Sequence, residues 1–135
     1  MPFYARETQQ ILRYGDTDRQ GHINNAVYST LFESGRVGVL FDAAKGLPPA
    51  GHSFVLAQLN ISFVTEMFWP ATVTIGTNVA KIGTSSVRFA QGVYVGENTH
   101  ATAESVVVFT NTETRKSTPI PTWIRDYLNE LSISE

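Results

Sequence analysis

The residues of this 135-residue chain that could do chemistry are concentrated in one short segment near its start. The segment carries two carboxylates, Asp16 and Asp18, followed by His22 and by the adjacent Asn24 and Asn25. Its turn-rich composition predicts a loop, and either asparagine is suited to cap a following helix. The first turn of a helix has unpaired amides and partial positive charge, so it can polarise a carbonyl or hold an oxyanion. A carboxylate beside it can attack that carbonyl or activate water, which indicates acyl-group chemistry.

A structural role is the alternative for each of these residues. Aspartate in loops commonly binds backbone amides, and Asp16, next to the end of a strand, is expected to do so. For Asp18 both a turn role and a catalytic role are open on this ground. His22 is either an acid or substrate contact, or a hydrogen-bonded support of the loop.

The elements that must position this segment follow from the apolar pattern. Strand-forming residues in loose alternation predict a first strand over residues 3–14. Apolar residues at helical spacing predict a helix from Asn24 or Asn25 to Lys45–Gly46, where glycine and the following prolines end it. Gly35, in the middle of this helix, costs about 1 kcal/mol relative to alanine. That cost indicates close packing, against another helix across a dimer or around an acyl chain.

The rest of the chain is rich in strand-forming residues. The first of these stretches, Ser53–Phe63, is apolar at most positions, as in a strand covered on both faces. A short helix opens at Pro121. The order strand, long helix, four strands, short helix predicts the α+β class, with one long central helix wrapped by an antiparallel sheet, as in the hotdog fold. The other predicted strands are Thr72–Lys81, Ser86–Val95 and His100–Thr110.

Composition indicates a single soluble domain spanning 1–135. The chain is 42% apolar, has a net charge of −2 and contains no cysteine. Its ten basic residues form no run, so no nucleic-acid partner is expected. The absence of a signal pattern and of a membrane-length apolar run indicates a cytoplasmic protein. No metal-ligand or cofactor motif is present, and the G-x-S-x-G of serine hydrolases is missing, so we expect no metal and no cofactor.

The motif G-D-T-D-x-x-G-H-x-N-N-x-x-Y, followed by F-E-x-x-R, resembles the 4-hydroxybenzoyl-CoA thioesterase-like branch of the hotdog superfamily. Residues 59–63 also match that family, and the resemblance covers roughly residues 3–110. It implies a metal-free acyl-CoA thioesterase with two active sites at the subunit interface of a homodimer. Asp18 matches the catalytic carboxylate, as nucleophile or general base, and Asn25 supplies the amide that activates the thioester carbonyl.

The resemblance also suggests substrate contacts. Gly21 permits the close turn, and Tyr28 and Glu33 match motif positions. His22-Ile23-Asn24-Asn25 departs from the founding enzymes and recurs in relatives acting on fatty acyl groups, so an aromatic substrate is not assumed. The acyl group is expected along the central helix, near Tyr28 and Phe63. The resemblance places the nucleotide end of coenzyme A on the surface near the loop Gly83-Thr84-Ser85-Ser86, which favours Lys81, Ser85 and Ser86 as its contacts.

Two other functions stay open at this point. A non-catalytic acyl-CoA-binding hotdog domain would have no need of Asp18. A hotdog dehydratase would want a catalytic histidine, which keeps His22 under consideration. Because an open sheet edge invites strand pairing, we expect self-association as a homodimer or a dimer of dimers.

Overall fold

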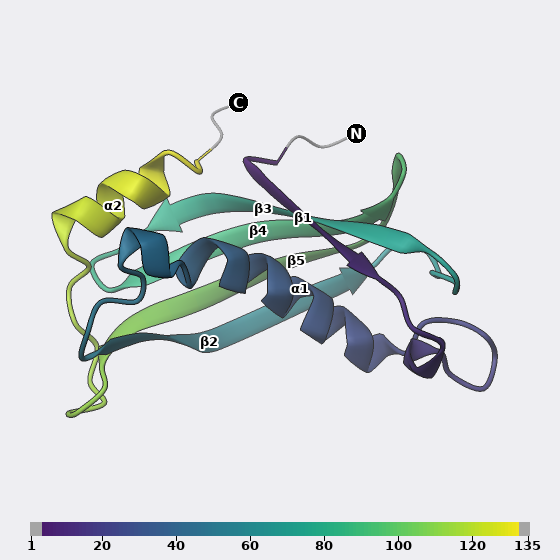
Figure 1. Ribbon diagram of the computed structural model, residues 1–135, viewed down its shortest axis with the longest axis horizontal. Helices are drawn as coiled ribbons and strands as arrows, with labels where there is room; N and C mark the ends of the chain where they lie inside the picture. Colours follow the sequence, from purple (N-terminus) through teal and green to yellow (C-terminus); the bar gives the residue numbers. More distant parts are fainter. Residues whose placement is uncertain (1–3, 133–135) are drawn as a thin grey trace.

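The computed structural model describes residues 4–132 and shows one long helix lying across one face of an antiparallel sheet (Figure 1). The strands are β1 (Arg6–Ile11), β2 (His52–Phe63), β3 (Thr72–Ile82), β4 (Ser86–Val95) and β5 (Asn98–Asn111). The helices are α1 (Asn25–Leu40) and α2 (Thr122–Asn129), with short 3-10 turns η1 (Tyr14–Asp16) and η2 (Ala43–Lys45). The predicted α+β class and order of elements are therefore confirmed, although Phe3 of the first predicted strand lies outside the described residues.

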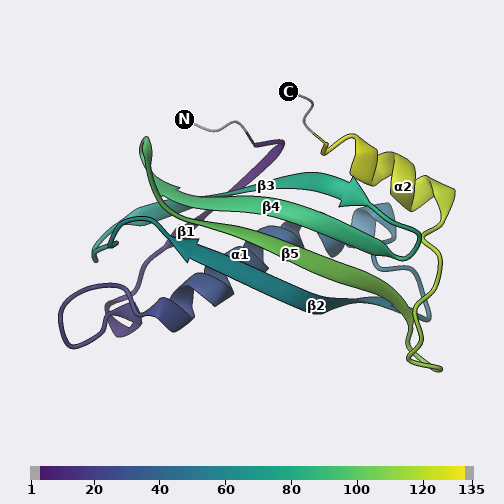
Figure 2. The ribbon, with the colours of Figure 1, turned by 180° about the vertical axis from the view of Figure 1, so that it is seen from behind.

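The strand order in the sheet is β1-β3-β4-β5-β2, with every neighbouring pair antiparallel. The first two strands of the sequence therefore lie at opposite edges. The connection between them, which contains η1 and α1, crosses the full width of the sheet, as Figure 1 shows. Seen from behind, the other face of the sheet is not covered by α1 (Figure 2). Within residues 4–132, no helix has the length and apolar character needed to cross a membrane.

Helix α1 packs on the sheet through a face that includes Gly35. A Cβ at this position would lie 2.6 Å from Nε2 of Gln91 and 2.8 Å from Oγ1 of Thr77. The Gln91 amide instead donates to the Phe32 carbonyl of α1 at 3.0 Å and to Thr77 Oγ1 at 2.9 Å. Gly35 therefore does allow close packing, but against the strands β3 and β4 of its own sheet rather than the helix or acyl chain considered above.

Two further sequence expectations are wrong in detail. Helix α1 ends at Leu40 rather than at Lys45–Gly46, because Phe41 is extended and Asp42 begins η2 by accepting from the Ala44 amide. Gly46, with φ +72°, closes this short turn instead of the long helix.

Strand β2 is not covered on both faces as its composition predicts. It is an edge strand paired only with β5, and Val55, Leu56 and Phe63 are each about half exposed. Its apolar residues thus leave an uncovered apolar edge, which is a feature that native proteins usually cover or blunt.

Candidate active site

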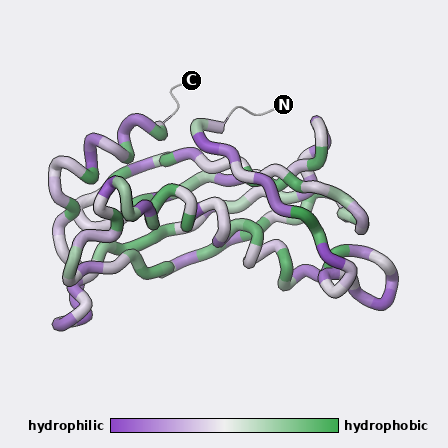
Figure 3. Tube along the Cα trace, in the orientation of Figure 1, coloured by the Kyte–Doolittle hydropathy of each residue, from purple (hydrophilic) through white to green (hydrophobic). Residues whose placement is uncertain are grey.

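A pocket of about 410 Å³ opens where the loop before α1, the first turns of α1 and the end of β2 meet. The loop projects from one end of the molecule in Figure 1 and is mostly hydrophilic in Figure 3. Five residues singled out from the sequence line this one pocket, although they come from three separate elements. The lining residues are Asp18, Gln20, His22, Ile23, Asn25, Tyr28, Phe63, Val64, Thr65, Glu66 and Met67.

The carboxylate of Asp18 is held by the loop that carries it. Its Oδ1 accepts hydrogen bonds from the backbone amides of Gln20, at 2.8 Å, and His22, at 3.1 Å. The Asp18 amide in turn donates to the His22 carbonyl at 2.8 Å, and Gly21 closes the turn with φ +84°. Among residues 4–132, Oδ2 has no hydrogen-bond partner, so the loop holds one carboxylate oxygen and leaves the other unpaired.

The start of α1 lies in the same pocket. Asn24 is the N-cap: its side-chain oxygen accepts from the Ala26 amide at 3.0 Å. Asn25 is therefore the first helical residue, and its own backbone amide has no hydrogen-bond partner in the described part of the chain. An unpaired amide at a helix start carries partial positive charge and can accept the oxygen of a polarised carbonyl.

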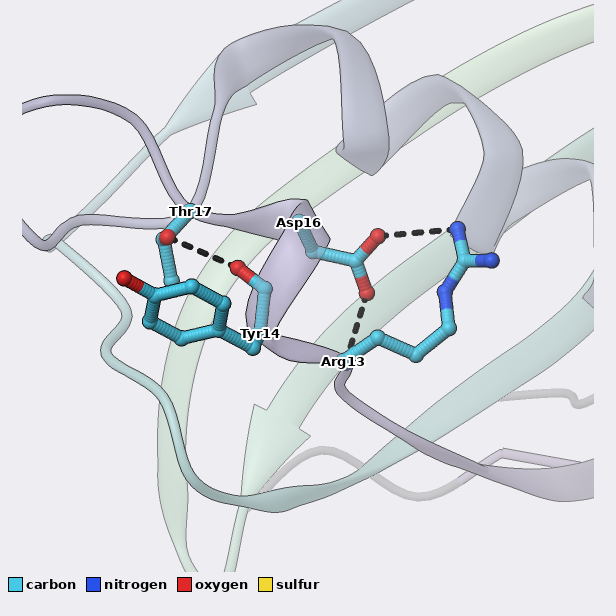
Figure 4. A network of polar contacts seen from close by, with 4 residues as sticks. All are labelled: Arg13, Tyr14, Asp16 and Thr17. Carbon is cyan, nitrogen blue, oxygen red and sulfur yellow. Dashed lines mark hydrogen bonds and ion pairs between the residues drawn. The ribbon is translucent and has the colours of Figure 1, made fainter.

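Asp16 has a structural role in the loop, as expected from the sequence. It is buried and accepts from the Arg13 amide at 2.8 Å and from Arg13 Nη2 at 3.0 Å (Figure 4). Burial alone opposes ionisation, but the two Arg13 hydrogen bonds and the guanidinium charge outweigh it and lower the pKa of Asp16. The Asp16 carbonyl accepts from the Asn24 amide at 2.9 Å, which ties this support directly to the helix cap.

His22 has a partner that the sequence did not indicate. Its Nε2 lies 3.3 Å from Oε2 of Glu66, and its ring packs edge-on against Phe68 with centroids 5.0 Å apart. Glu66 also lines the pocket. Nothing in the sequence links Glu66 to the loop, because it lies in the connection between β2 and β3 and reaches His22 only through the fold.

Tyr28 and Phe63 form the apolar side of the pocket. Their rings meet edge to face with centroids 5.1 Å apart, Tyr28 being buried and Phe63 about half exposed. Burial raises the pKa of the Tyr28 hydroxyl, and the negative charge of Glu66 raises it further. Phe32 of α1 and Phe54 of β2 do not line this pocket: Phe32 is buried between α1 and the sheet, and Phe54 is buried beside a second cavity.

The remaining predicted residues lie outside this pocket. Glu33 lines a second cavity, with Arg36. Lys81 and Ser86 line a third cavity, of about 230 Å³, which also contains Arg88. That cavity belongs to the hairpin between β3 and β4, at the end of the sheet away from the loop before α1 (Figure 1). Ser85 lies in this hairpin, where its carbonyl accepts from the Phe109 amide at 2.8 Å.

One long helix laid across a five-stranded antiparallel sheet, with a short C-terminal helix, is the hotdog fold of thioesterases. Residues 12–128 match the thioesterase-like superfamily, and the chain belongs to that family. The resemblance stated from the loop motif is thus confirmed at the level of the family.

Solved structures agree with this assignment. A protein from Pseudomonas aeruginosa has 24% identity and a TM-score of 0.87, with 97% of this chain and 94% of that chain covered. A predicted thioesterase from Bacillus stearothermophilus has 28% identity and a TM-score of 0.85, with 96% and 97% covered. A thioesterase from Thermus thermophilus, complexed with coenzyme A and Zn, has 25% identity and a TM-score of 0.83, with 97% and 96% covered. No curated protein matches the sequence significantly.

Proposed function

We propose that this protein hydrolyses an acyl-CoA thioester, with a fatty acyl group, to the free acid and coenzyme A. The observation that carries the proposal is the pairing of two features in one pocket. Asp18 presents a carboxylate fixed at one oxygen by two backbone amides, and the adjacent start of α1 presents the unpaired Asn25 amide. The solved thioesterase from Thermus thermophilus, complexed with coenzyme A and Zn, supports the choice of carrier.

The proposed reaction begins with the thioester oxygen bound at the Asn25 amide, where the helix start stabilises negative charge as it develops. Asp18 then attacks the carbonyl carbon through Oδ2, or takes a proton from a water that attacks it. The carbon–sulfur bond breaks and the coenzyme A thiolate leaves. If Asp18 is the nucleophile, a water hydrolyses the resulting anhydride in a second step. Either route consumes one water and releases one carboxylic acid.

The neighbouring residues take supporting roles in this proposal. His22, held by Glu66, contacts the substrate near the thioester. Gly21 allows the turn in which its own amide donates to the Asp18 carbonyl. Tyr28 and Phe63 contact the first part of the acyl chain. Lys81, Ser85 and Ser86 at the hairpin between β3 and β4, and Glu33 on α1, are retained as substrate contacts that reach the coenzyme or acyl group across an assembly.

The active unit in this proposal is a homodimer formed by pairing of β2 edges. Strand β2 has twelve residues and an open edge with exposed apolar side chains, which suits antiparallel pairing into one continuous sheet. Asp18, Asn25 and Phe63 are exposed in the single chain. A second copy along β2 would cover this pocket and exclude water, which strengthens the electrostatic effect of the helix start. We assign the dimer to the cytoplasm, in keeping with its composition.

The test is thiol release from a panel of acyl-CoAs by the wild type and Asp18→Asn. Asparagine can still accept the Gln20 and His22 amides, so the loop should persist while turnover falls at least about a hundredfold. Asp126→Asn is the matched control, because Asp126 is exposed on α2. Equal rates in the two Asp18 forms would exclude it as the catalytic carboxylate. Acyl-CoA binding without turnover would instead identify a binding domain.

A single turnover in water labelled with oxygen-18 tests whether Asp18 acts as the nucleophile or as the general base. Label found in Asp18 after that turnover, with unlabelled acid product, identifies Asp18 as the nucleophile, because water has then opened the anhydride at the Asp18 carbonyl. Label found only in the acid product excludes that route and is the result that general-base catalysis requires.

A further inference from the structure

A buried cation without an anionic partner lies beside the core, in a cavity separate from the pocket. Arg36 of α1 is only 6% exposed. Its Nη1 donates to Gln91 Oε1 at 3.4 Å, near the upper limit for a hydrogen bond. Within residues 4–132, no carboxylate forms an ion pair with it, and burial lowers its pKa although the charge of Glu33 opposes this. A buried charge of this kind is costly unless an acceptor binds it.

The cavity that Arg36 lines is otherwise almost entirely apolar. It has a volume of about 210 Å³. Apart from Arg36 it has one charged residue, Glu33, which is exposed. Guanidinium donors that reach an apolar cavity are suited to bind an oxygen at the end of an apolar ligand. The apolar lining residues are Val37, Leu40, Phe41, Phe54, Leu56 and Val107.

This cavity and the candidate active site occupy the two ends of one seam between α1 and β2. The active-site pocket is lined by Asn25 and Tyr28 of α1 and by Phe63 of β2, and the second cavity by Arg36 of α1 and Leu56 of β2. Eleven residues separate Asn25 from Arg36, which corresponds to about 16 Å along the helix axis at 1.5 Å per residue. A medium-length acyl chain starting at the Asn25 amide can therefore direct its far end toward Arg36.

Resting on the proposed thioesterase function, we propose that Arg36 binds an oxygen at the distal end of the acyl group. The preferred substrates are then acyl-CoAs whose chain ends in a carboxylate or a hydroxyl rather than a methyl group. Both ends offer a further acceptor to a guanidinium that donates, in residues 4–132, to Gln91 Oε1 at 3.4 Å. A carboxylate makes the stronger, charge-assisted pair, whereas a hydroxyl can also donate to Glu33.

The experiment compares kcat/KM for three coenzyme A esters of equal chain length: sebacyl, hydroxydecanoyl with a terminal hydroxyl, and decanoyl. The wild type should prefer at least one oxygenated ester by about tenfold or more, as expected for a hydrogen bond to a buried charge. Arg36→Met should remove this preference and leave decanoyl hydrolysis within a few fold. No preference in the wild type, or a preference that persists in Arg36→Met, would overturn the proposal.

Two measurements distinguish a substrate-binding role of Arg36 from a purely structural role. Replacing a buried unpaired charge by an apolar side chain of similar length is often neutral or stabilising, so Arg36→Met should not lower the unfolding midpoint. A lowered midpoint with an equal loss on all three esters would make Arg36 merely structural. Arg6→Met is the matched control, because Arg6 Nη1 donates to the Gly38 carbonyl of the same helix, away from the cavity.

Direct binding separates this inference from the proposed function. If no ester is hydrolysed, the thioesterase proposal fails, and calorimetric titration with free sebacate and decanoate still tests Arg36. Tighter binding of sebacate by the wild type, but not by Arg36→Met, would support the site. Equal binding of the two acids would reject it.

Discussion

Oε2 of Glu66 lies 3.3 Å from Nε2 of His22, which joins the connection after β2 to the loop before α1. The Glu66 side chain is 64% exposed and that of His22 27% exposed, so solvent screens the pair. Exposed ion pairs of this kind contribute about 0–1 kcal/mol. The contact therefore orients the imidazole toward the pocket more than it stabilises the fold.

Glu66→Gln should lower kcat/KM by no more than about fivefold, the equivalent of 1 kcal/mol. If Glu66 acts only through His22, the double variant His22→Asn with Glu66→Gln should be no slower than His22→Asn alone. Thiol release by the four proteins checks this. Glu97→Gln, in the exposed turn after β4, is the control. Additive losses would mean that Glu66 contacts the substrate itself.

Gly35→Ala should destabilise the protein, although alanine is the better helix former by about 1 kcal/mol. Its Cβ would lie 2.6 Å from Gln91 Nε2 and 2.8 Å from Ile75 Cγ2 and Thr77 Oγ1, so these packed side chains must shift. We expect a net loss of about 1–3 kcal/mol in the free energy of unfolding, measured in urea. Gly38→Ala is the matched control in the same helix. It has nothing within 4 Å of the added Cβ and should be neutral or stabilising.

Asp16→Asn should reduce stability near neutral pH and lose its effect in acid. The pKa of Asp16 is lower in the folded protein than its ordinary value, so its contribution is complete above the ordinary pKa. That contribution disappears as the pH falls through the lower folded-state pKa. Hydrogen bonds to a charged group predict a cost of about 1–3 kcal/mol at pH 7. Urea unfolding of both proteins from pH 7 to pH 3 measures it, and a constant difference would contradict the assignment.

Leu56→Glu should dissociate the proposed dimer, because it places carboxylates from two copies near each other on paired β2 edges. Light scattering after size exclusion would show the mass of a single chain, and turnover should fall with dissociation. Ile11→Glu is the matched control. Ile11 is even more exposed but belongs to β1, at the opposite edge of the sheet. Loss of the dimer in the Ile11 variant alone would move the interface to that edge.

Local patterns predict well those features that depend on neighbouring residues. The cap at Asn24, the turn at Gly21 and the supporting role of Asp16 each depend on contacts within a few positions. Hence the loop and the start of α1 were predictable from the sequence. The apolar composition of Val55 and Leu56 was misleading, because an exposed edge strand can have the same apolar composition as a strand buried within its own sheet.

Features that depend on tertiary contacts had no such signal. Glu66 reaches His22 through the fold, and Gln91 reaches Arg36 from the middle of β4. The early end of α1 depends instead on a short-range backbone pairing that interrupts the helical pattern. The Asp42 amide donates to the Leu47 carbonyl and the Leu47 amide donates back to Asp42, which turns the chain toward β2 before the helical pattern runs out.

The strand order β1-β3-β4-β5-β2 also determines when the pocket can exist during synthesis. The loop carrying Asp18 is made early, but β1 must wait for β3, and β2 pairs with β5, which ends at Asn111. A ribosome-bound chain that stops at Val95 contains every residue of the pocket and lacks the strand that holds one wall of it. In that chain α1 already has β3 and β4 to pack against, but β2 has no partner, and a chaperone that shields its apolar residues until β5 appears would favour correct folding.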